Sequence, residues 1–175
     1  HKGSAFGNIG LPKQPGQEMF ENLLASELRE KLTSLVWLED ESQRIGQVNI
    51  PHTLWKTMRQ SPVYFLDIPF EERLQHIVQE YGQLDSEKLI EAIERISQKL
   101  GHLNAKTAIL GLKEGKTTES FAILLKYYDK YYFKSLHNRE GISSLLHTVE
   151  CKSVIPENAD QLTRISNRDP QIQKH

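Results

Sequence analysis

The sequence of 175 residues contains a single cysteine, Cys151, so no disulfide bond can form within the chain. No apolar run resembles a signal peptide or a membrane-spanning helix. No HExxH motif is present, and no cysteine and histidine lie at the spacing of a metal site, so we assign no structural metal. These absences predict a protein of the reducing cytoplasm that does not contact a membrane.

A strong net charge is also absent. The 22 lysines and arginines nearly balance the 23 aspartates and glutamates, which leaves a formal charge of -1. Any contact with nucleic acid must therefore come from a local patch of positive charge. Hydrophobic residues make up 38% of the chain and charged residues 26%, a composition that predicts a folded domain with a buried core.

Residues 1–82 alternate short apolar runs with helical patterns. The first 16 residues read as a loop that enters the domain from an upstream segment, and apolar residues then recur at helical spacing over 17–32. Pro51 and Pro69 suit the first turns of two further helices. Strands are expected at 34–38, 45–50 and 63–68. This order of strands and helices predicts an α/β core over residues 1–82.

The character of the chain changes after Gly82. Helices are expected at 85–100, 104–113 and 118–133, and they make up a helical subdomain over residues 83–140. In the C-terminal segment, residues 141–175, the stretch 145–149 is either a strand or a last helical turn. Residues 158–175 are expected to form a polar tail.

Acidic residues follow the first expected strand. An apolar strand that ends in carboxylates, here Glu39 and Asp40, resembles the Walker B element of phosphate-loop proteins, which holds magnesium beside bound phosphates. Arg44 in the same turn can give bidentate hydrogen bonds to a phosphate. The alternatives remain open: many buried strands end in charged residues, and Arg44 can simply neutralise its acidic neighbours.

Two weaker candidates for anion binding lie elsewhere in residues 1–82. Arg73 follows a strand and a proline, as in small-molecule kinases of the phosphate-loop class, where it would reach a transferred group; alternatively it pairs with a glutamate one helical turn away. Gly3 and Ser4 offer backbone amides to an anion, or form an ordinary turn. A phosphate loop is itself missing, because residues 111–117 are one residue short of the GxxxxGK[ST] spacing.

Three lysines, Lys126, Lys130 and Lys134, recur every four residues on the expected helix 118–133 and its end, interleaved with aromatic residues. Cations for phosphates beside aromatic rings for bases are typical of proteins that bind single-stranded RNA. The alternative is an amphipathic helix with an aromatic core face and solvated lysines.

Several segments together resemble the tRNA 2-selenouridine synthases. The blocks that carry the resemblance are His1–Gly7, Gln14–Asn22, Trp37–Gly46, Ile50–Met58 and Tyr127–Ser135. Their order and spacing also fit, so the likeness extends over residues 1–135. The first and third of these blocks are the more specific ones.

The resemblance implies a two-domain enzyme in which a rhodanese-like domain with a reactive cysteine precedes a phosphate-loop domain. This chain would be the second half of that second domain: a partial P-loop NTPase-like parallel sheet with a large helical C-terminal portion. The family is understood to convert 2-thiouridine in tRNA to 2-selenouridine by way of an S-geranylated intermediate, using geranyl diphosphate and selenophosphate. With this resemblance, we expect Glu39, Asp40 and Arg44 to form a diphosphate or magnesium site, assisted by Arg73. We expect the helix that contains Lys126 to contact tRNA.

Neither the rhodanese cysteine motif nor a Walker A loop occurs in this sequence. Because the Walker A strand is normally central in such a sheet, its loss would expose the apolar faces of its neighbours. We therefore expect this chain to be inactive alone, and to be unstable or completed by a missing segment. Two other functions stay open: a phosphate-loop small-molecule kinase, which residues 67–74 permit, and a non-catalytic helical module that binds RNA or protein.

Overall fold

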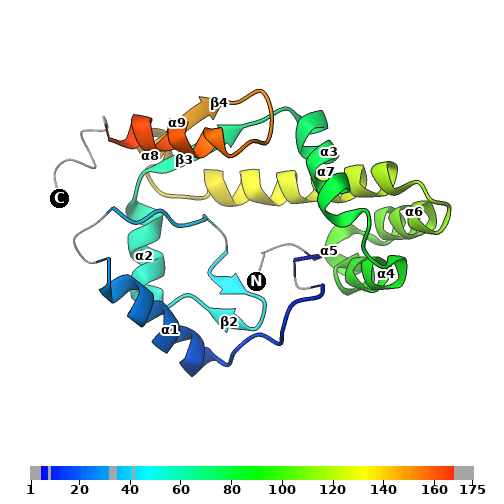
Figure 1. Cartoon of the computed structure of the whole chain (residues 1–175), viewed down its shortest axis with the longest axis horizontal. Helices are drawn as coiled ribbons and strands as arrows, with labels where there is room; N and C mark the ends of the chain where they lie inside the picture. Colours follow the sequence, from blue (N-terminus) through cyan, green and yellow to red (C-terminus); the bar gives the residue numbers. More distant parts are fainter. Residues whose placement is uncertain (1–4, 8, 32–34, 41, 168–175) are drawn as a thin grey trace. The chain divides into compact units, whose positions relative to one another are not determined.

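A computed structural model describes residues 5–7, 9–31, 35–40 and 42–167. The chain divides into two compact units, residues 1–61 and 62–175 (Figure 1). The domain boundaries expected at residues 82 and 140 stay predictions. No helix within the described ranges is both long and apolar enough to span a bilayer.

The first unit contains two helices and a hairpin. Its elements are α1 (Gln17–Arg29), β1 (Arg44–Ile45), β2 (Val48–Asn49) and α2 (His52–Gln60). The strand predicted at 45–50 is instead an antiparallel hairpin, because Gly46 adopts a positive φ of 62° and turns the chain between β1 and β2. Helix α2 begins directly after Pro51, as predicted.

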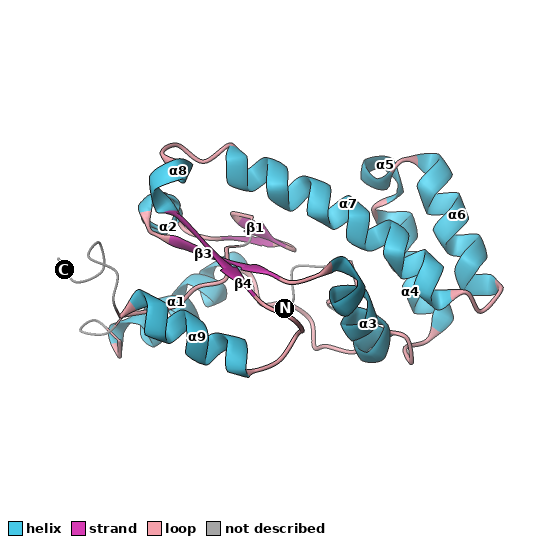
Figure 2. Ribbon diagram, turned by 90° about the horizontal axis from the view of Figure 1, so that it is seen from above, coloured by secondary structure: helices cyan, strands magenta, loops and turns pink. Residues whose placement is uncertain are grey.

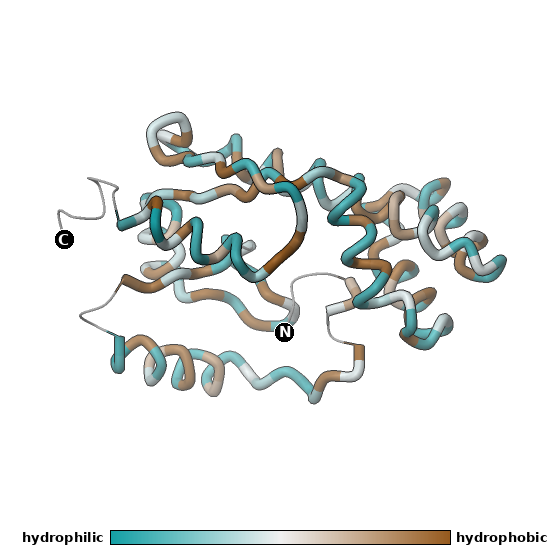
Figure 3. Tube along the Cα trace, turned by 45° about the horizontal axis from the view of Figure 1, so that its top comes forward, coloured by the Kyte–Doolittle hydropathy of each residue, from teal (hydrophilic) through white to brown (hydrophobic). Residues whose placement is uncertain are grey.

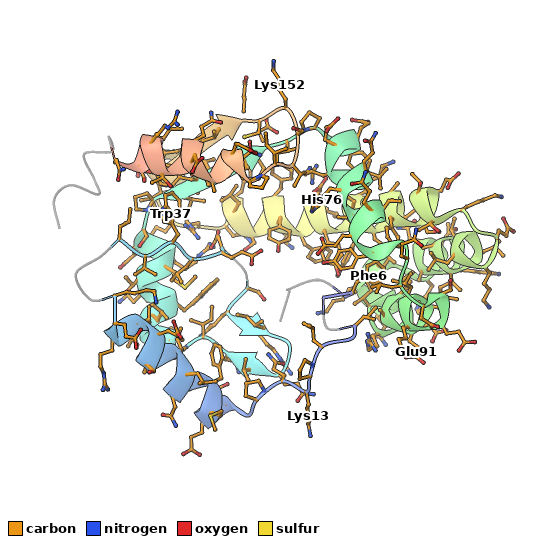
Figure 4. All side chains as sticks on the ribbon, viewed as in Figure 1. Phe6, Lys13, Trp37, His76, Glu91 and Lys152 are labelled. Carbon is orange, nitrogen blue, oxygen red and sulfur yellow. The ribbon has the colours of Figure 1, made fainter. Side chains whose placement is uncertain are left out.

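The strand predicted at 34–38 is wrong for the described residues 35–38, which belong to neither sheet. Leu35 and Leu38 are 52% and 44% exposed, and Trp37 is 43% exposed (Figure 4). An apolar run becomes a strand only where another strand hydrogen-bonds to it, and sequence periodicity carries no information about that partner. Helix α1 is amphipathic as predicted (Figure 3), but none of its residues is buried.

The second unit is built on a pair of parallel strands, β3 (Val63–Asp67) and β4 (Leu146–Glu150). Helices α7 (Thr117–His137) and α9 (Glu157–Ser166) lie on opposite sides of this pair (Figure 2). On one face a small core forms from Ile68, Val149 and Cys151, against which Leu162 and Ile165 of α9 pack. On the other face the ring of Phe65 lies 5.7 Å from that of Phe133 on α7. The α/β class and the parallel pairing are thus confirmed.

The remaining helices connect β3 to β4. They are α3 (Phe70–Tyr81), α4 (Ser86–Arg95), α5 (Ser97–Leu100), α6 (His102–Lys113) and α8 (Ile142–Leu145), with α7 between α6 and α8. Local signals predicted most of them: the Asp85 carboxylate, for example, accepts a hydrogen bond of 3.0 Å from the backbone N–H of Lys88 and so caps α4. The helix predicted over 85–100 is interrupted at Ile96, where α4 gives way to α5.

The polar tail predicted over 158–175 is wrong for residues 158–166, which form most of α9. Leu162 and Ile165 are the reason, because at helical spacing two apolar side chains are enough to dock the helix on β3 and β4. The Asn158 amide also donates a hydrogen bond of 2.9 Å to the Ser153 carbonyl and fixes the first turn. The stretch 145–149, left open by the sequence, is mainly strand.

Helices α6 and α7 pack closely at Gly111. The buried Ser120 hydroxyl donates to the carbonyl of Ala108 across the pair, at 2.9 Å, and a Cβ added at Gly111 would overlap that hydroxyl oxygen. Inside a helix, alanine in place of glycine raises the free energy of unfolding by about 1 kcal/mol, whereas overpacking lowers it by about 1–3 kcal/mol. The close approach of the two helices therefore depends on the absence of a side chain at residue 111.

We expect Gly111→Ala to leave the free energy of unfolding unchanged or to lower it by up to about 2 kcal/mol, because the clash offsets the helix preference. In a Ser120→Ala background the same change should stabilise the chain by about 1 kcal/mol, since the overlapping oxygen is gone. Urea denaturation of the four proteins of this cycle measures both effects. Equal effects of Gly111→Ala in the two backgrounds would contradict the clash.

Candidate binding surfaces

Arg44 lies at the start of the hairpin with its guanidinium exposed. Its Nε donates a hydrogen bond of 3.1 Å to the Gly46 carbonyl, while its own carbonyl accepts one of 2.6 Å from the Ser42 hydroxyl. Within the described part of the chain its two terminal nitrogens have no hydrogen-bond partner. The guanidinium is therefore held by one nitrogen and presents the other two outward, which is the arrangement that bidentate anion binding requires.

Two glutamine side chains hold this hairpin in place. The Gln14 amide donates to the Ile45 carbonyl at 2.7 Å and accepts from the Gln47 N–H at 2.9 Å. The Gln17 amide does the same with both backbone groups of Asn49, at 2.9 and 2.8 Å. Each glutamine side chain thus forms the hydrogen bonds to backbone N–H and C=O groups of the hairpin that a neighbouring strand would otherwise form. Neither glutamine was identified as functional from the sequence, although both lie in a block that carries the family resemblance.

Glu39 and Asp40 lie in the segment that leads to the hairpin, Glu39 exposed and Asp40 half-buried. They do not follow a strand in the described residues, so the Walker B geometry expected for them is not formed there. Within the same described ranges no group of three histidine, cysteine or acidic side chains converges as a metal site would require. Their part in holding magnesium or a diphosphate stays a prediction. Gly3 and Ser4 lie outside the described residues.

Arg73 joins helix α3 to helix α7 and to Ile68, the residue that follows β3. Its two terminal nitrogens pair with the two carboxylate oxygens of Asp129 on α7, at 2.6 and 3.0 Å, and its Nε donates to the Ile68 carbonyl at 3.0 Å. Both side chains are about three-quarters buried, with 29% and 25% exposure. The acidic partner lies 56 residues away and not one helical turn away. With all of its nitrogens engaged, Arg73 fixes α3 against α7, and contact with a transferred group stays a prediction.

The three lysines project from one side of the second half of α7. Lys126, Lys130 and Lys134 are all exposed, and the Lys126 ammonium lies 5.9 Å from the centre of the Phe70 ring on α3. None of the three forms an ion pair with a described residue. A row of cations with this spacing gives a local positive surface on a chain with almost no net charge.

The aromatic residues in the second half of α7 are not fully buried. The buried residues of this helix are Ser120, Phe121, Leu124 and Leu136. Tyr131, Tyr132 and Phe133 are each about half exposed, at 45%, 45% and 46%. At Tyr131 and Tyr132 the aromatic-core interpretation is therefore wrong, whereas Phe133 keeps a ring contact with Phe65 of β3. Nearer the core, burial and then the neighbouring Tyr131 raise the pKa of Tyr127, which keeps its hydroxyl neutral at physiological pH.

A family model described as the AAA domain of tRNA 2-selenouridine synthase matches residues 1–159. The chain belongs to this family. The matched range includes the hairpin with Arg44, the Arg73–Asp129 pair and the lysine row of α7. No solved structure gave a significant match.

Curated relatives named tRNA 2-selenouridine synthase agree with this family assignment. The relative from Marinobacter nauticus is 32% identical over an alignment that covers 81% of this chain and 47% of the relative. The relative from Chromohalobacter salexigens is 28% identical over 89% of this chain and 53% of its own length. A third, from Cupriavidus pinatubonensis, is 38% identical over 46% of this chain and 23% of the relative. The chain thus spans about half the length of its relatives, or less.

We expect Asp129→Asn to lower the free energy of unfolding by about 1–3 kcal/mol, because it leaves a largely buried guanidinium without its charged partner. Glu91→Gln on the exposed surface of α4 is the matched control and should cost less than about 0.5 kcal/mol. In an Arg73→Met background the cost of Asp129→Asn should shrink, which a double-mutant cycle by urea denaturation measures. Strictly additive losses would show that the two side chains do not stabilise each other.

Proposed function

We propose that this chain forms part of a transferase of the cytoplasm that converts wobble 2-thiouridine in tRNA to 2-selenouridine through S-geranyl-2-thiouridine. The observation that carries the proposal is the family match over residues 1–159, together with relatives named tRNA 2-selenouridine synthase. Two further parts would complete the P-loop-type enzyme. One is a rhodanese-like domain with a reactive cysteine, and the other is the Walker A loop of the phosphate-loop domain. This chain alone would then be inactive.

Arg44 and its neighbours would hold the diphosphate of geranyl diphosphate or the phosphate of selenophosphate. In the first step the sulfur of 2-thiouridine attacks the carbon bonded to the diphosphate and a C–S bond forms. The C–O electron pair leaves with the diphosphate, and the N3 proton of the thiouridine is lost to solvent. Positive charge at the diphosphate oxygens stabilises that leaving group. Support comes from the Arg44 guanidinium, which is oriented by Gly46 and has two nitrogens without a partner among the described residues. Glu39 and Asp40 would act through a magnesium ion, and Gly3 and Ser4 through their backbone amides.

The lysine row of α7 would bind the phosphate backbone of tRNA. Lys126 and Lys134 lie eight residues apart, or about 12 Å along the helix, so the row is long enough to contact more than one phosphate of the backbone. The half-exposed rings beside them suit contact with unpaired bases, and such bases occur in the anticodon loop that contains the wobble position. The same surface also supports the second candidate, a non-catalytic RNA-binding module. No observation favours a small-molecule kinase, since Arg73 is engaged by Asp129.

Mass analysis of the wobble nucleosides tests the reaction itself. Thiolated tRNA and geranyl diphosphate are incubated with the intact parent protein or with this chain, and we expect the geranylated nucleoside only with the parent. Absence of that product with both would count against the proposed reaction. Retained tRNA binding without any modification would then favour the non-catalytic module.

In the intact parent, we expect Arg44→Ala to lower kcat/KM for geranyl diphosphate about 10- to 100-fold, the equivalent of losing one or two charge-assisted hydrogen bonds. Arg44→Lys should recover only part of the loss, because an ammonium group cannot make the planar pair of bonds. Arg29→Ala, which removes an exposed arginine from the last turn of α1, is the control and should leave kcat/KM unchanged. Unchanged kinetics of Arg44→Ala would remove this residue from the donor site.

Simultaneous replacement of Lys126, Lys130 and Lys134 by alanine should weaken tRNA binding. It should also flatten the slope of log K against log salt by about 2–3, because each phosphate contact contributes roughly 0.7–0.9 to that slope. Replacement of Lys99, Lys106 and Lys113, which are exposed on α5 and α6, removes the same charge and should change the slope much less. Filter binding over a salt series gives both values. Equal effects of the two triple variants would show that only total charge matters.

A further inference from the structure

The guanidinium of Arg44 takes its direction from the turn of the hairpin. Its Nε donates to the Gly46 carbonyl at 3.1 Å, and the side chain is exposed. Because a long exposed side chain has many rotamers, its direction is fixed only as well as this carbonyl is fixed. Gly46 supplies little restraint of its own, since glycine has no Cβ and tolerates many backbone conformations, here with a φ of 62°. The direction of the carbonyl must therefore be set by another group.

The side chain of Gln14 holds the peptide group that contains this carbonyl. The Gly46 C=O and the Gln47 N–H belong to one planar peptide group, and in a trans peptide they point in opposite directions. The Gln47 N–H donates to Gln14 Oε1 at 2.9 Å, so the plane of this peptide group is fixed. The Gly46 carbonyl is thereby directed away from Gln14, and Arg44 binds it there.

Gln14 also holds the peptide group on the other side of the glycine. Its Nε2 donates to the Ile45 carbonyl at 2.7 Å, so each peptide group that flanks Gly46 has a hydrogen bond to the same side chain. Gln17 makes two comparable hydrogen bonds, but both go to Asn49. Neither of the Gln17 bonds involves a peptide group next to Gly46. Only Gln14 is therefore placed to set the direction of the carbonyl that Arg44 contacts.

We propose that Gln14 is a positioning residue that orients the Arg44 guanidinium toward an anionic donor. It acts through the peptide group between Gly46 and Gln47 and does not touch the donor. A guanidinium that is oriented before binding loses less side-chain freedom when it takes up a phosphate, which favours both binding and reaction. The link from Gln14 to Arg44 concerns geometry alone, whereas its kinetic effect rests on the proposed function of Arg44 at the donor site.

Gln14→Met and Gln17→Met in the intact parent protein test the proposal, because each removes two hydrogen bonds to the hairpin and keeps the length of the side chain. We expect Gln14→Met to lower kcat/KM for geranyl diphosphate about 3- to 10-fold, the effect of one hydrogen bond, and Gln17→Met to lower it less than about twofold. In an Arg44→Ala background the effect of Gln14→Met should vanish. A loss from Gln17→Met as large as that from Gln14→Met, or an unchanged loss in the Arg44→Ala background, would overturn the proposal.

A spectroscopic readout separates the geometry from the reaction. With isotope-labelled arginine, the Nε–H resonance of Arg44 is identified by its absence in Arg44→Ala, and it should shift in Gln14→Met but not in Gln17→Met. A shift together with unchanged kinetics of Arg44→Ala would uphold the positioning and reject the donor site. An unmoved resonance in Gln14→Met would overturn the positioning itself.

Hydrogen exchange in the unaltered parent protein decides the question if Gln14→Met fails to fold. The Gln47 amide donates to Gln14 and should be protected from exchange. Protection of this amide would support the proposal. Exchange as fast as in an unstructured peptide would show that Gln14 does not hold the peptide group, and would overturn it.

Discussion

The second unit depends on the pairing of β3 with β4, which brings Val63 beside Leu146 and Asp67 beside Glu150. Parallel strands cannot be joined by a tight turn and need a crossover connection. Here that connection is the whole helical portion from α3 to α8, so these helices serve the sheet as well as one another. Closing so long a loop is entropically costly, and contacts along the crossover must offset that cost.

The Arg73–Asp129 pair is one of the contacts that hold the crossover in shape. It joins the start of α3 to the middle of α7, and through the Ile68 carbonyl it also reaches the end of β3. A single arginine therefore fixes the helix that carries the lysine row relative to the strand edge. At roughly one-quarter exposure the charges are only partly screened by water, so the pair is worth more than a surface salt bridge.

The sequence predicted those elements whose signals are local. Pro51 and Pro69 mark helix starts, and the apolar run at 63–68 marks β3; all three predictions are confirmed. It failed where the outcome depends on a distant partner. The run at 35–38 has the composition of a strand but no strand beside it, and α9 forms because two apolar residues find the face of β3 and β4. Periodicity describes a segment and says nothing about its neighbours in space.

The same limit explains what could be predicted of the binding surfaces. The lysine row follows from spacing alone, since residues four apart share one side of a helix. The partner of Arg73 lies 56 residues away and could not be read from its neighbours. Gln14 and Gln17 were missed because they act on backbone atoms of the hairpin, and no side-chain pattern in the sequence reveals such contacts.

The charge on α7 is the last consequence of that ion pair. Between Ser120 and His137 this helix has one acidic residue, Asp129, and three lysines. If Asp129 were solvated on the lysine side, it would cancel part of their field at close range. Because Arg73 pairs with both of its carboxylate oxygens, the charge of Asp129 is compensated within the fold and cancels little of the lysines' field. A contact that stabilises the crossover thus also leaves a cationic surface on a nearly neutral protein.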